Sequence, residues 1–277
     1  MIIFFAGADA SSFRKILLEK KVNGVLFSQY YSHDKSKDFF RDFIDYGAKV
    51  FMDSGGFTAR IRGVPLKIED YAEFLKKHKN GWTYCANLDV MNPDETLKNQ
   101  EYLEKQGIKA IPVFHYSEVK LKRKDLMEYY CKNYPYVAIG GVAATVRSSI
   151  IKKRYFDFCF SLAMKYKTKL HGFGVMDLES LYNYPWYSCD ATSWLAGAKF
   201  ARVYRFKHGK LLAANARLKM DLKGGDLLKF SNPLQYIDGS SLKYKRRCRQ
   251  NVEAFIQLEN FITKLWEKRG VVWKNKN

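Results

Sequence analysis

Polar side chains and glycines stand at the ends of several apolar segments of this sequence. The runs FMD, CANLD, IPVFH and WYSCD end in a carboxylate or an imidazole, and KLHGFG contains a further histidine. The side chains concerned are Asp53, Asp89, His115, His171 and Asp190. Carboxylates and imidazoles can attack, protonate or deprotonate a substrate, so this set indicates acid–base or nucleophilic catalysis if the fold brings the segment ends together.

The stretch KVFMDSGGFTA, residues 49–59, combines several of these features. A pair of carboxylates is used on sugar carbons, where one attacks or shields the carbon and the other moves a proton. The glycines after Asp53 and Ser54 would let the backbone approach a flat ligand, and the Phe57 ring would stack on a base. The stretch therefore predicts chemistry at the C1 position of a glycoside or a nucleoside.

Each of these features also has a purely structural interpretation. An aspartate at a strand end is often a helix N-cap, and Asp190, followed by Ala-Thr-Ser, fits that role. Pairs such as Gly140-Gly141 commonly form turns, and a core histidine is often only a hydrogen-bonded structural residue. The occurrence of three carboxylates and two histidines at equivalent positions favours the functional interpretation.

Apolar, β-branched and aromatic segments alternate with segments of helical periodicity. The predicted strands are residues 2–6, 24–28, 49–53, 83–89, 109–114, 136–140, 169–174 and 186–190, and the predicted helices include residues 11–21, 68–79, 93–106 and 148–167. This alternation predicts βα units and a parallel sheet. Eight strands in 277 residues fit a (β/α)8 TIM barrel, with a doubly wound sheet as the alternative. The carboxyl ends of parallel strands lie on one side, so the strand-end residues would converge there.

The segment after the last predicted strand differs from the rest of the chain. Residues 200–206 and 210–214 predict a hairpin, residues 219–241 read as a loop, and residues 244–269 read as a long basic helix. We interpret residues 1–277 as a single barrel domain in which residues 219–277 form a basic C-terminal loop and helix region. One of the eight strands could also come from residues 200–206.

The chain is strongly basic, with a formal net charge of +20. From residue 199 onward 19 Lys and Arg face only six Asp and Glu, so most of the surplus lies in the last third. A surplus of this size favours a polyanionic partner, and nucleic acid is the usual one. Within KYKRRCR, the predicted phosphate-binding residues are Lys245, Arg246, Arg247 and Arg249, with a solvated helix face as the alternative.

Cysteine spacing and hydropathy restrict the remaining possibilities. The five cysteines include no C-x-C or C-x-x-C pair, so neither a zinc site built on such pairs nor a disulfide framework is expected. No apolar run reaches the roughly 18 residues of a membrane helix, and the N-terminus has no basic region typical of a secretory signal. A cytoplasmic protein is expected, in the host cytoplasm if a phage encodes it.

DSGGF at residues 53–57 resembles the signature of the tRNA-guanine transglycosylase superfamily. LDV around Asp89, the Gly140-Gly141 pair, KLHGFG and SCDATSW follow in the order that the family has them. The resemblance implies a (β/α)8 barrel enzyme that exchanges a guanine in nucleic acid for a 7-deazaguanine, without an organic cofactor or ATP. It spans residues 50–195.

The resemblance also implies roles for individual residues. Asp190 would attack C1′ and expel guanine, leaving a covalent glycosyl–enzyme ester, and Asp53 would be the general acid/base. Asp89 would accept hydrogen bonds from the N1 and N2 edge of the base. The remaining expected substrate-binding residues are Ser54, Phe57, His115, Gly140, Gly141, His171 and Gly172. Phe57 and His171 match positions that sandwich the base, whereas His115 replaces a glutamine of the tRNA enzymes.

The sequence departs from the tRNA enzymes in one informative way. Those enzymes carry closely spaced zinc-binding cysteines after the nucleophile, whereas only Cys248 follows Asp190 here. Compact relatives without the zinc subdomain modify DNA, in phage and in bacterial DNA-modification clusters. The expectation is therefore a metal-free pentosyltransferase that inserts preQ0 or a derivative into DNA. The alternatives are a tRNA-guanine transglycosylase without zinc, a TIM-barrel glycoside hydrolase and a non-catalytic nucleic-acid binder; the oligomeric state is open.

Overall fold

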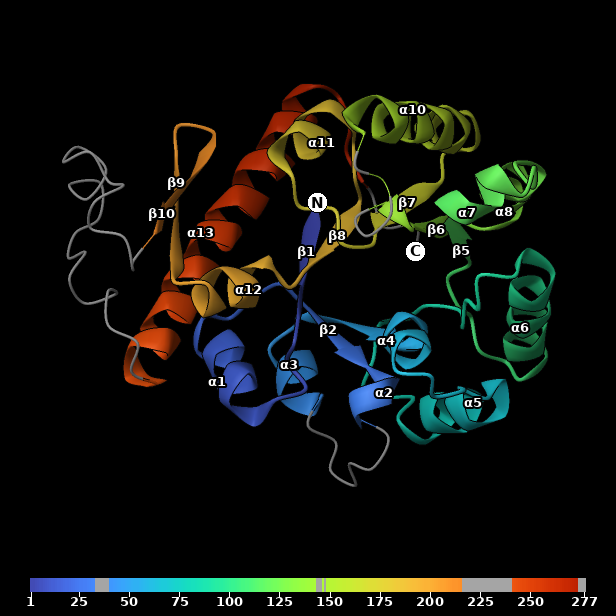
Figure 1. Cartoon of the computed structure of the whole chain (residues 1–277), viewed down its shortest axis with the longest axis horizontal. Helices are drawn as coiled ribbons and strands as arrows, with labels where there is room; N and C mark the ends of the chain where they lie inside the picture. Colours follow the sequence, from blue (N-terminus) through green and yellow to red (C-terminus); the bar gives the residue numbers. More distant parts are fainter. Residues whose placement is uncertain (33–39, 143–145, 147, 216–240, 274–277) are drawn as a thin grey trace.

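Eight parallel strands form the centre of the computed structural model, in the order β4-β3-β2-β1-β8-β7-β6-β5 (Figure 1). The structure describes all residues except 33–39, 143–145, 147, 216–240 and 274–277. The strands are β1 (Ile2–Ala6), β2 (Gly24–Ser28), β3 (Lys49–Asp53), β4 (Tyr84–Cys85), β5 (Val113–His115), β6 (Tyr136–Gly140), β7 (Lys169–Gly172) and β8 (Ser188–Ala191). A parallel bridge between Ala86 and Ile111 joins the two edges of the sheet. The sheet is therefore curled into a TIM-barrel-like fold, as the alternation predicted.

The bounds of β1, β2, β3 and β6 agree with the prediction. β7 ends two residues earlier than predicted, β8 begins two residues later and ends one residue later, and β4 and β5 differ most. These two strands are shorter than the predicted residues 83–89 and 109–114. The bridge, made by Asn87 N–H to Ile111 O and Ile111 N–H to Cys85 O, takes the place of a longer ladder. Beyond the bridge, the Asn87 side chain donates a hydrogen bond to the Thr96 carbonyl in α6. This bond holds the segment after β4 against α6.

Helices follow most of the strands along the chain. They are α1 (Ser11–Glu19), α2 (Gln29–Ser32), α3 (Arg41–Asp45), α4 (Gly56–Ile61), α5 (Ile68–Lys77), α6 (Pro93–Lys105), α7 (Tyr116–Lys120), α8 (Asp125–Asn133), α10 (Ser149–Tyr166), α11 (Leu178–Asn183) and α12 (Ser193–Lys199). Asn92 caps α6, because its side chain accepts hydrogen bonds from the Asp94 and Glu95 amides, and Pro93 is the first helical residue. Helix α11 has only six residues, which fits the short segment between β7 and β8.

The C-terminal part of the chain forms the predicted hairpin and helix. Strands β9 (Arg202–Lys207) and β10 (Lys210–Asn215) pair in antiparallel fashion, and α13 (Ser241–Lys268) follows. The run that could have supplied a barrel strand is thus a separate hairpin. Residues 219–240 of the expected basic loop lie outside the described part of the chain. No helix among the described residues has the length and apolar character required to cross a membrane.

Two apolar layers hold the barrel together. One lies between the strands and the surrounding helices, and the other fills the barrel interior with residues such as Phe4, Phe51, Tyr136 and Tyr187. Within the interior, His171 Nδ1 lies 2.7 Å from the Ser188 hydroxyl, which also contacts the Tyr136 hydroxyl at 2.5 Å. A polar chain therefore runs through an otherwise apolar core, from the Tyr136 hydroxyl through Ser188 to His171 Nδ1. The buried His171 Nε2 has no hydrogen-bond partner among the described residues.

Helix α13 is fastened to the first strand of the barrel. The buried Glu259 accepts hydrogen bonds from the Ile3 amide and from the Asn23 side chain, and Thr263 accepts one from the N-terminal ammonium of Met1. Asn251, which is fully buried, accepts from the Tyr204 amide and donates to two carbonyls, those of Trp194 and Arg202. Segments from both ends of the chain are thus held against each other.

We expect Asn251→Ala to lower the free energy of unfolding by about 2–4 kcal/mol, because it removes three hydrogen bonds and leaves buried backbone groups without partners. Urea unfolding followed by circular dichroism measures the change. Asn260→Ala is the matched control, since Asn260 is exposed on the same helix. Equal stability of the two variants would contradict this assignment.

Candidate active site

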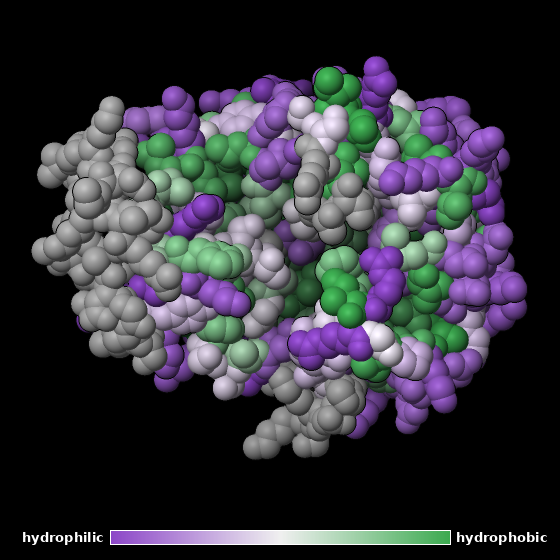
Figure 2. Space-filling view, viewed as in Figure 1, coloured by the Kyte–Doolittle hydropathy of each residue, from purple (hydrophilic) through white to green (hydrophobic). Residues whose placement is uncertain are grey.

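The carboxyl ends of the strands surround a hollow on one face of the molecule. Figure 2 shows this hollow near the centre of the face, beside the position of α4 in Figure 1. A cavity of about 420 Å³ lies there, lined by residues that include Gly56, Phe57, Asp89, Met91 and His115. Its walls come from α4, from the segments after α4 and β4 and from the end of β5. Three of the sequence-predicted residues, Phe57, Asp89 and His115, therefore line one cavity.

Asp53, the last residue of β3, lies partly buried beside this cavity. Its Oδ2 accepts a hydrogen bond of 2.9 Å from the Gly55 amide. Burial and the neighbouring Asp89 carboxylate raise the pKa of Asp53 to about 7, with smaller contributions from Asp190 and Asp9 and against the effect of the Gly55 hydrogen bond. Asp89 and Asp190 are therefore close enough to act electrostatically on Asp53, and Asp53 can hold or release a proton near neutral pH.

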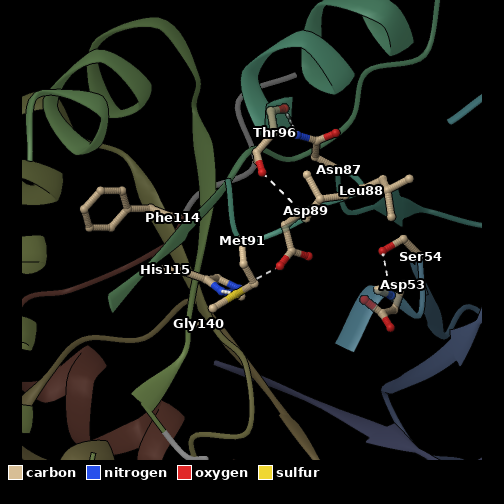
Figure 3. Close-up of polar contacts among 12 residues, drawn as sticks. Asp53, Ser54, Asn87, Leu88, Asp89, Met91, Thr96, Phe114, His115 and Gly140 are labelled. Atoms are coloured by element: carbon tan, nitrogen blue, oxygen red, sulfur yellow. Dashed lines mark hydrogen bonds and ion pairs between the residues drawn. The ribbon is translucent and has the colours of Figure 1, made fainter. Parts of the chain in front are cut away.

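Asp89 and His115 form an ion pair across the cavity. Asp89 Oδ2 lies 3.0 Å from His115 Nε2, and Figure 3 shows the Asp89 side chain between His115 and Asp53. Burial lowers the pKa of His115, but the Asp89 carboxylate outweighs that effect and the net pKa is raised. His115 Nδ1 lies 2.8 Å from the sulfur of Met91, a residue in the left-handed region at φ 63°. The pair presents a carboxylate and an imidazole to the same space.

Asp190 lies in β8, three strands away from Asp53 in the sheet. Its Oδ1 accepts a 2.7 Å hydrogen bond from the Gly174 amide and lies 3.7 Å from His171 Nε2. The N-cap of α12 is Thr192 and not Asp190, so the capping interpretation of Asp190 was wrong. One carboxylate oxygen is held by the loop after β7, and among the described residues the other accepts no hydrogen bond.

The two glycines of DSGGF permit close packing within the protein. Gly55 has φ 82°, and a Cβ there would lie 2.4 Å from the Tyr30 Cβ. A Cβ on Gly56 would lie 2.9 Å from the Asp89 carbonyl oxygen. Both glycines thus bring α4 against α2 and against the segment after β4, which places Phe57 at the cavity wall. The expected gap for a ligand is filled by these protein neighbours.

Two arginines at the C-terminal end of α4 lie beside aromatic rings, and Phe57 and Arg60 of this group line the cavity. The Arg60 guanidinium lies 5.7 Å from the Phe57 ring centroid, and that of Arg62 lies 5.7 and 5.9 Å from the Tyr30 and Tyr31 ring centroids. Phe57 is 52% exposed and Tyr31 is 45% exposed. We call these five residues the α4 rim. Sequence reasoning found only Phe57, although R-x-R directly after DSGGFTA was visible.

Three expected substrate-binding residues do not face the cavity. Ser54 is fully buried and its hydroxyl accepts from the Gly56 amide. His171 is also fully buried and stacks on Phe51 at 4.6 Å, because its strand points it into the barrel interior. Gly172 packs against Trp186, where a Cβ would lie 2.7 Å from the indole ring. The expectation that these residues contact the base is therefore corrected, and His171 supports Asp190 from below.

Gly140, the last residue of β6, and Gly141 after it pack against the segment that contains His115. A Cβ on Gly140 would lie 2.7 Å from His115 Nε2, so this glycine allows the imidazole to lie against the backbone. Gly141 has φ 78°, a conformation that favours glycine. Their contact with a base stays a prediction.

The expected phosphate grip in KYKRRCR needs correction for two of its four residues. Arg247 is buried and donates to the Ala198 carbonyl, and Arg249 forms an ion pair with Glu19 at 3.1 Å. Both side chains hold α13 in place because the helical period turns them toward the barrel. Lys245 and Arg246 are exposed, and their contact with nucleic-acid phosphates stays a prediction.

Two further carboxylates near the site escaped the sequence reasoning. Asp9 lies three residues beyond the end of β1 and accepts from the Ser28 amide and the Ser32 hydroxyl. Glu118 lies in α7, and burial raises its pKa to about 8 although the neighbouring His115 opposes this effect. Both were overlooked because only the last residue of each strand was considered. Within the described ranges no group of three His, Cys, Asp or Glu could hold a metal ion.

Comparison of the chain with protein-family models and with curated proteins gives no match. Among solved structures, the chain is similar to the crystal structure of a HpcH/Hpal aldolase/citrate lyase family protein from Burkholderia cenocepacia J2315. That similarity has a TM-score of 0.40 and 12% identity, and it covers 71% of this chain and 90% of that one. Strand order and pairing, and not this low similarity, define the fold described above.

We expect Asp53→Asn to raise the free energy of unfolding at pH 8 by about 1–3 kcal/mol. The folded-state pKa of about 7 lies above the ordinary value of 3.8, so protonation of Asp53 favours the folded state. That stability is complete below pH 4 and is lost as the pH rises through 7. The neutral amide avoids this loss and can still accept from Gly55.

Thermal unfolding between pH 4 and pH 8 measures the effect, with Glu101→Gln on the exposed face of α6 as the control. The advantage of Asp53→Asn should shrink toward pH 4. An advantage that is absent at pH 8, or equal at both ends of the range, would show that Asp53 does not carry a raised pKa.

Proposed function

We propose that this protein is a DNA-guanine transglycosylase that exchanges guanine in DNA for a 7-deazaguanine, preQ0 or a derivative of it. The observation that carries the proposal is the meeting of Asp53, Asp89 and Asp190 at the open end of the strands, close enough for both other carboxylates to raise the pKa of Asp53. The resemblance of DSGGF and the four motifs after it to the transglycosylase superfamily supplies the reaction. The formal net charge of +20 favours a polyanionic substrate such as DNA.

In the proposed reaction Asp190 attacks C1′ of the target nucleotide. The bond from the free carboxylate oxygen to C1′ forms as the bond from C1′ to guanine N9 breaks, and the electron pair leaves with the guanine. The Gly174 amide holds the other oxygen at 2.7 Å, which orients the nucleophile. The covalent ester preserves the sugar until a second base attacks C1′ and releases the aspartate.

Asp53 is suited to the proton transfers of both half-reactions. A pKa of about 7 gives substantial amounts of both protonation states near neutral pH. The protonated form would give its proton to the departing guanine, and the carboxylate would then take one from the incoming 7-deazaguanine. One group can thus serve both steps, and the enzyme returns to its starting protonation state.

Asp89 and His115 supply base recognition in this scheme. A carboxylate accepts two hydrogen bonds from the N1–H and N2–H edge of a guanine-like base, and His115 at 3.0 Å holds that carboxylate in place. Both residues line the cavity of about 420 Å³ together with Phe57. The exposed Phe57 ring offers a stacking surface for the base within that cavity.

The α4 rim supports a single-stranded or unstacked nucleic acid as the substrate. C1′ is inaccessible within a paired helix, so the nucleotide must leave the stack at a cost of a few kcal/mol. Arg60 and Arg62 can hold phosphates beside the cavity, and their aromatic neighbours can stack on flanking bases. Neutral glycans would gain nothing from the arginines, which disfavours a glycoside hydrolase.

The test is mass spectrometry of nucleosides from DNA and, separately, from tRNA, after incubation with the protein and preQ0. Incorporation into DNA is expected. Incorporation into tRNA alone would favour the tRNA-modifying alternative, and binding of DNA without any exchange would favour a non-catalytic binder. Either of these two results would overturn the proposal.

We expect Asp190→Asn to reduce base exchange about 10³-fold or more, because an amide is a poor nucleophile at C1′. Release of labelled guanine from a single-stranded oligonucleotide measures the rate. The variant should still bind the oligonucleotide as wild type does. Asp157→Asn on the exposed surface of α10 is the control and should exchange normally; retained exchange in Asp190→Asn would reject Asp190 as the nucleophile.

The double variant Arg60→Gln, Arg62→Gln should bind single-stranded DNA about ten- to a hundredfold more weakly and lower the salt slope by about 1–2, since two phosphate contacts are lost. Fluorescence anisotropy over 50–300 mM salt measures both values. Lys98→Gln, Lys105→Gln on α6 removes the same charge away from the cavity. Equal losses in the two double variants would mean that net charge, and not the α4 rim, governs binding.

A further inference from the structure

A second large cavity lies at the opposite end of the barrel from the candidate active site. It has a volume of about 850 Å³, roughly twice that of the cavity beside Asp53. Lys49, Tyr84, Tyr136 and Lys169 line it, and each is the first residue of a strand. Strand beginnings lie away from the strand ends in a parallel barrel. We call this cavity the basal groove, and nothing in the proposed reaction uses it.

The lining of the basal groove has an unusual composition. It contains four lysines, five tyrosines and Trp273, and no Asp or Glu stands among its described lining residues. None of the four lysines forms an ion pair with an acidic residue within the described part of the chain. The nearby acids are engaged elsewhere, since Glu128 pairs with Lys165 and Glu104 accepts from the Tyr134 hydroxyl. Glu128 also interacts electrostatically with Lys132, so the uncompensated positive charge of the groove is that of Lys49, Lys167 and Lys169.

Two polar groups in the groove lack the partners that burial calls for. Lys169 lies with its ammonium 4.5 Å from the Tyr187 ring centroid, and burial lowers its pKa. Trp273 packs edge-on against Tyr187 at 6.0 Å, and its buried Nε1–H has no hydrogen-bond acceptor among the described residues. Both groups contact the Tyr187 ring. The ammonium and the indole N–H are hydrogen-bond donors, and the ammonium also attracts an anion.

We propose that the basal groove binds a nucleotide, with the phosphate on Lys49 and Lys169 and the base among the tyrosines and Trp273. Lysines suit phosphate as compact point charges, and aromatic side chains stack on any base. The volume lies in the range of small-molecule sites. The groove stands on its own geometry, so the proposal does not depend on the transglycosylase reaction.

The groove would recognise charge and a flat ring rather than a particular base. For that reason AMP is a better probe than a guanine nucleotide, which the candidate active site could also bind. Isothermal titration of AMP, adenosine and inorganic phosphate separates the contributions of ring and charge. We expect AMP to bind about tenfold or more tightly than either fragment, in a salt-dependent manner.

Variants locate the site. Lys169→Gln should weaken AMP binding at least about tenfold, and Trp273→Phe should weaken it while keeping the ring. Lys98→Gln, an exposed lysine of α6, should leave it unchanged, and so should Asp190→Asn, which separates this site from the catalytic one. Thermal unfolding verifies that each variant is folded; Lys49→Gln replaces Lys169→Gln if that variant is not.

The tetranucleotide d(A)4 distinguishes a free nucleotide from a unit of a strand. Binding of d(A)4 that is tighter than that of AMP and sensitive to Lys169→Gln would identify a strand as the source, and AMP binding as tight as d(A)4 would identify the free nucleotide. Either result supports a nucleotide site. AMP that binds no better than phosphate, or that binds Lys169→Gln as well as wild type, would overturn the proposal.

Discussion

The crowding of carboxylates where the parallel strands end is the constraint on which the site depends. Strands β3 and β8 and the segment after β4 deliver Asp53, Asp190 and Asp89 to one partly buried region, where water cannot fully screen their charges. Mutual repulsion and burial keep a proton on Asp53 near neutral pH. The same physics that disfavours the folded state supplies a group that can give and take protons, which is a common relation between stability and catalysis.

The rest of the fold holds this unfavourable arrangement in place. Single hydrogen bonds fix each carboxylate: Gly55 for Asp53, His115 for Asp89 and Gly174 for Asp190. Near Asp190, a hydrogen bond between His171 Nδ1 and the Ser188 hydroxyl fixes the buried imidazole. Farther away, Glu259 binds α13 to β1 and to Asn23, and Asn251 binds it to α12 and β9. Rigid surroundings of this kind keep reacting groups within the small tolerances that catalysis allows.

Much of this architecture could be predicted from the sequence. The apolar runs and their spacing indicated all eight barrel strands, the hairpin and the terminal helix, because hydrophobic periodicity directly reflects burial. The strand-end aspartates were also visible. What the side chains contact was not, since it depends on residues far apart in sequence: the burial of His171 under Phe51, the use of Arg247 as a structural donor, and the pairing of Arg60 and Arg62 with three aromatic rings. Basic character alone did not separate structural arginines from exposed ones.

The central claim is that the Asp190 carboxylate becomes covalently bonded to C1′ of a nucleotide in DNA. The most direct measurement is peptide mapping by mass spectrometry after the protein is mixed with a guanine-containing oligonucleotide and quenched with acid. The account predicts a deoxyribose-linked adduct on the peptide that contains Asp190, formed together with one equivalent of free guanine. An adduct on another residue would contradict it. So would release of guanine without any adduct when no incoming base is present.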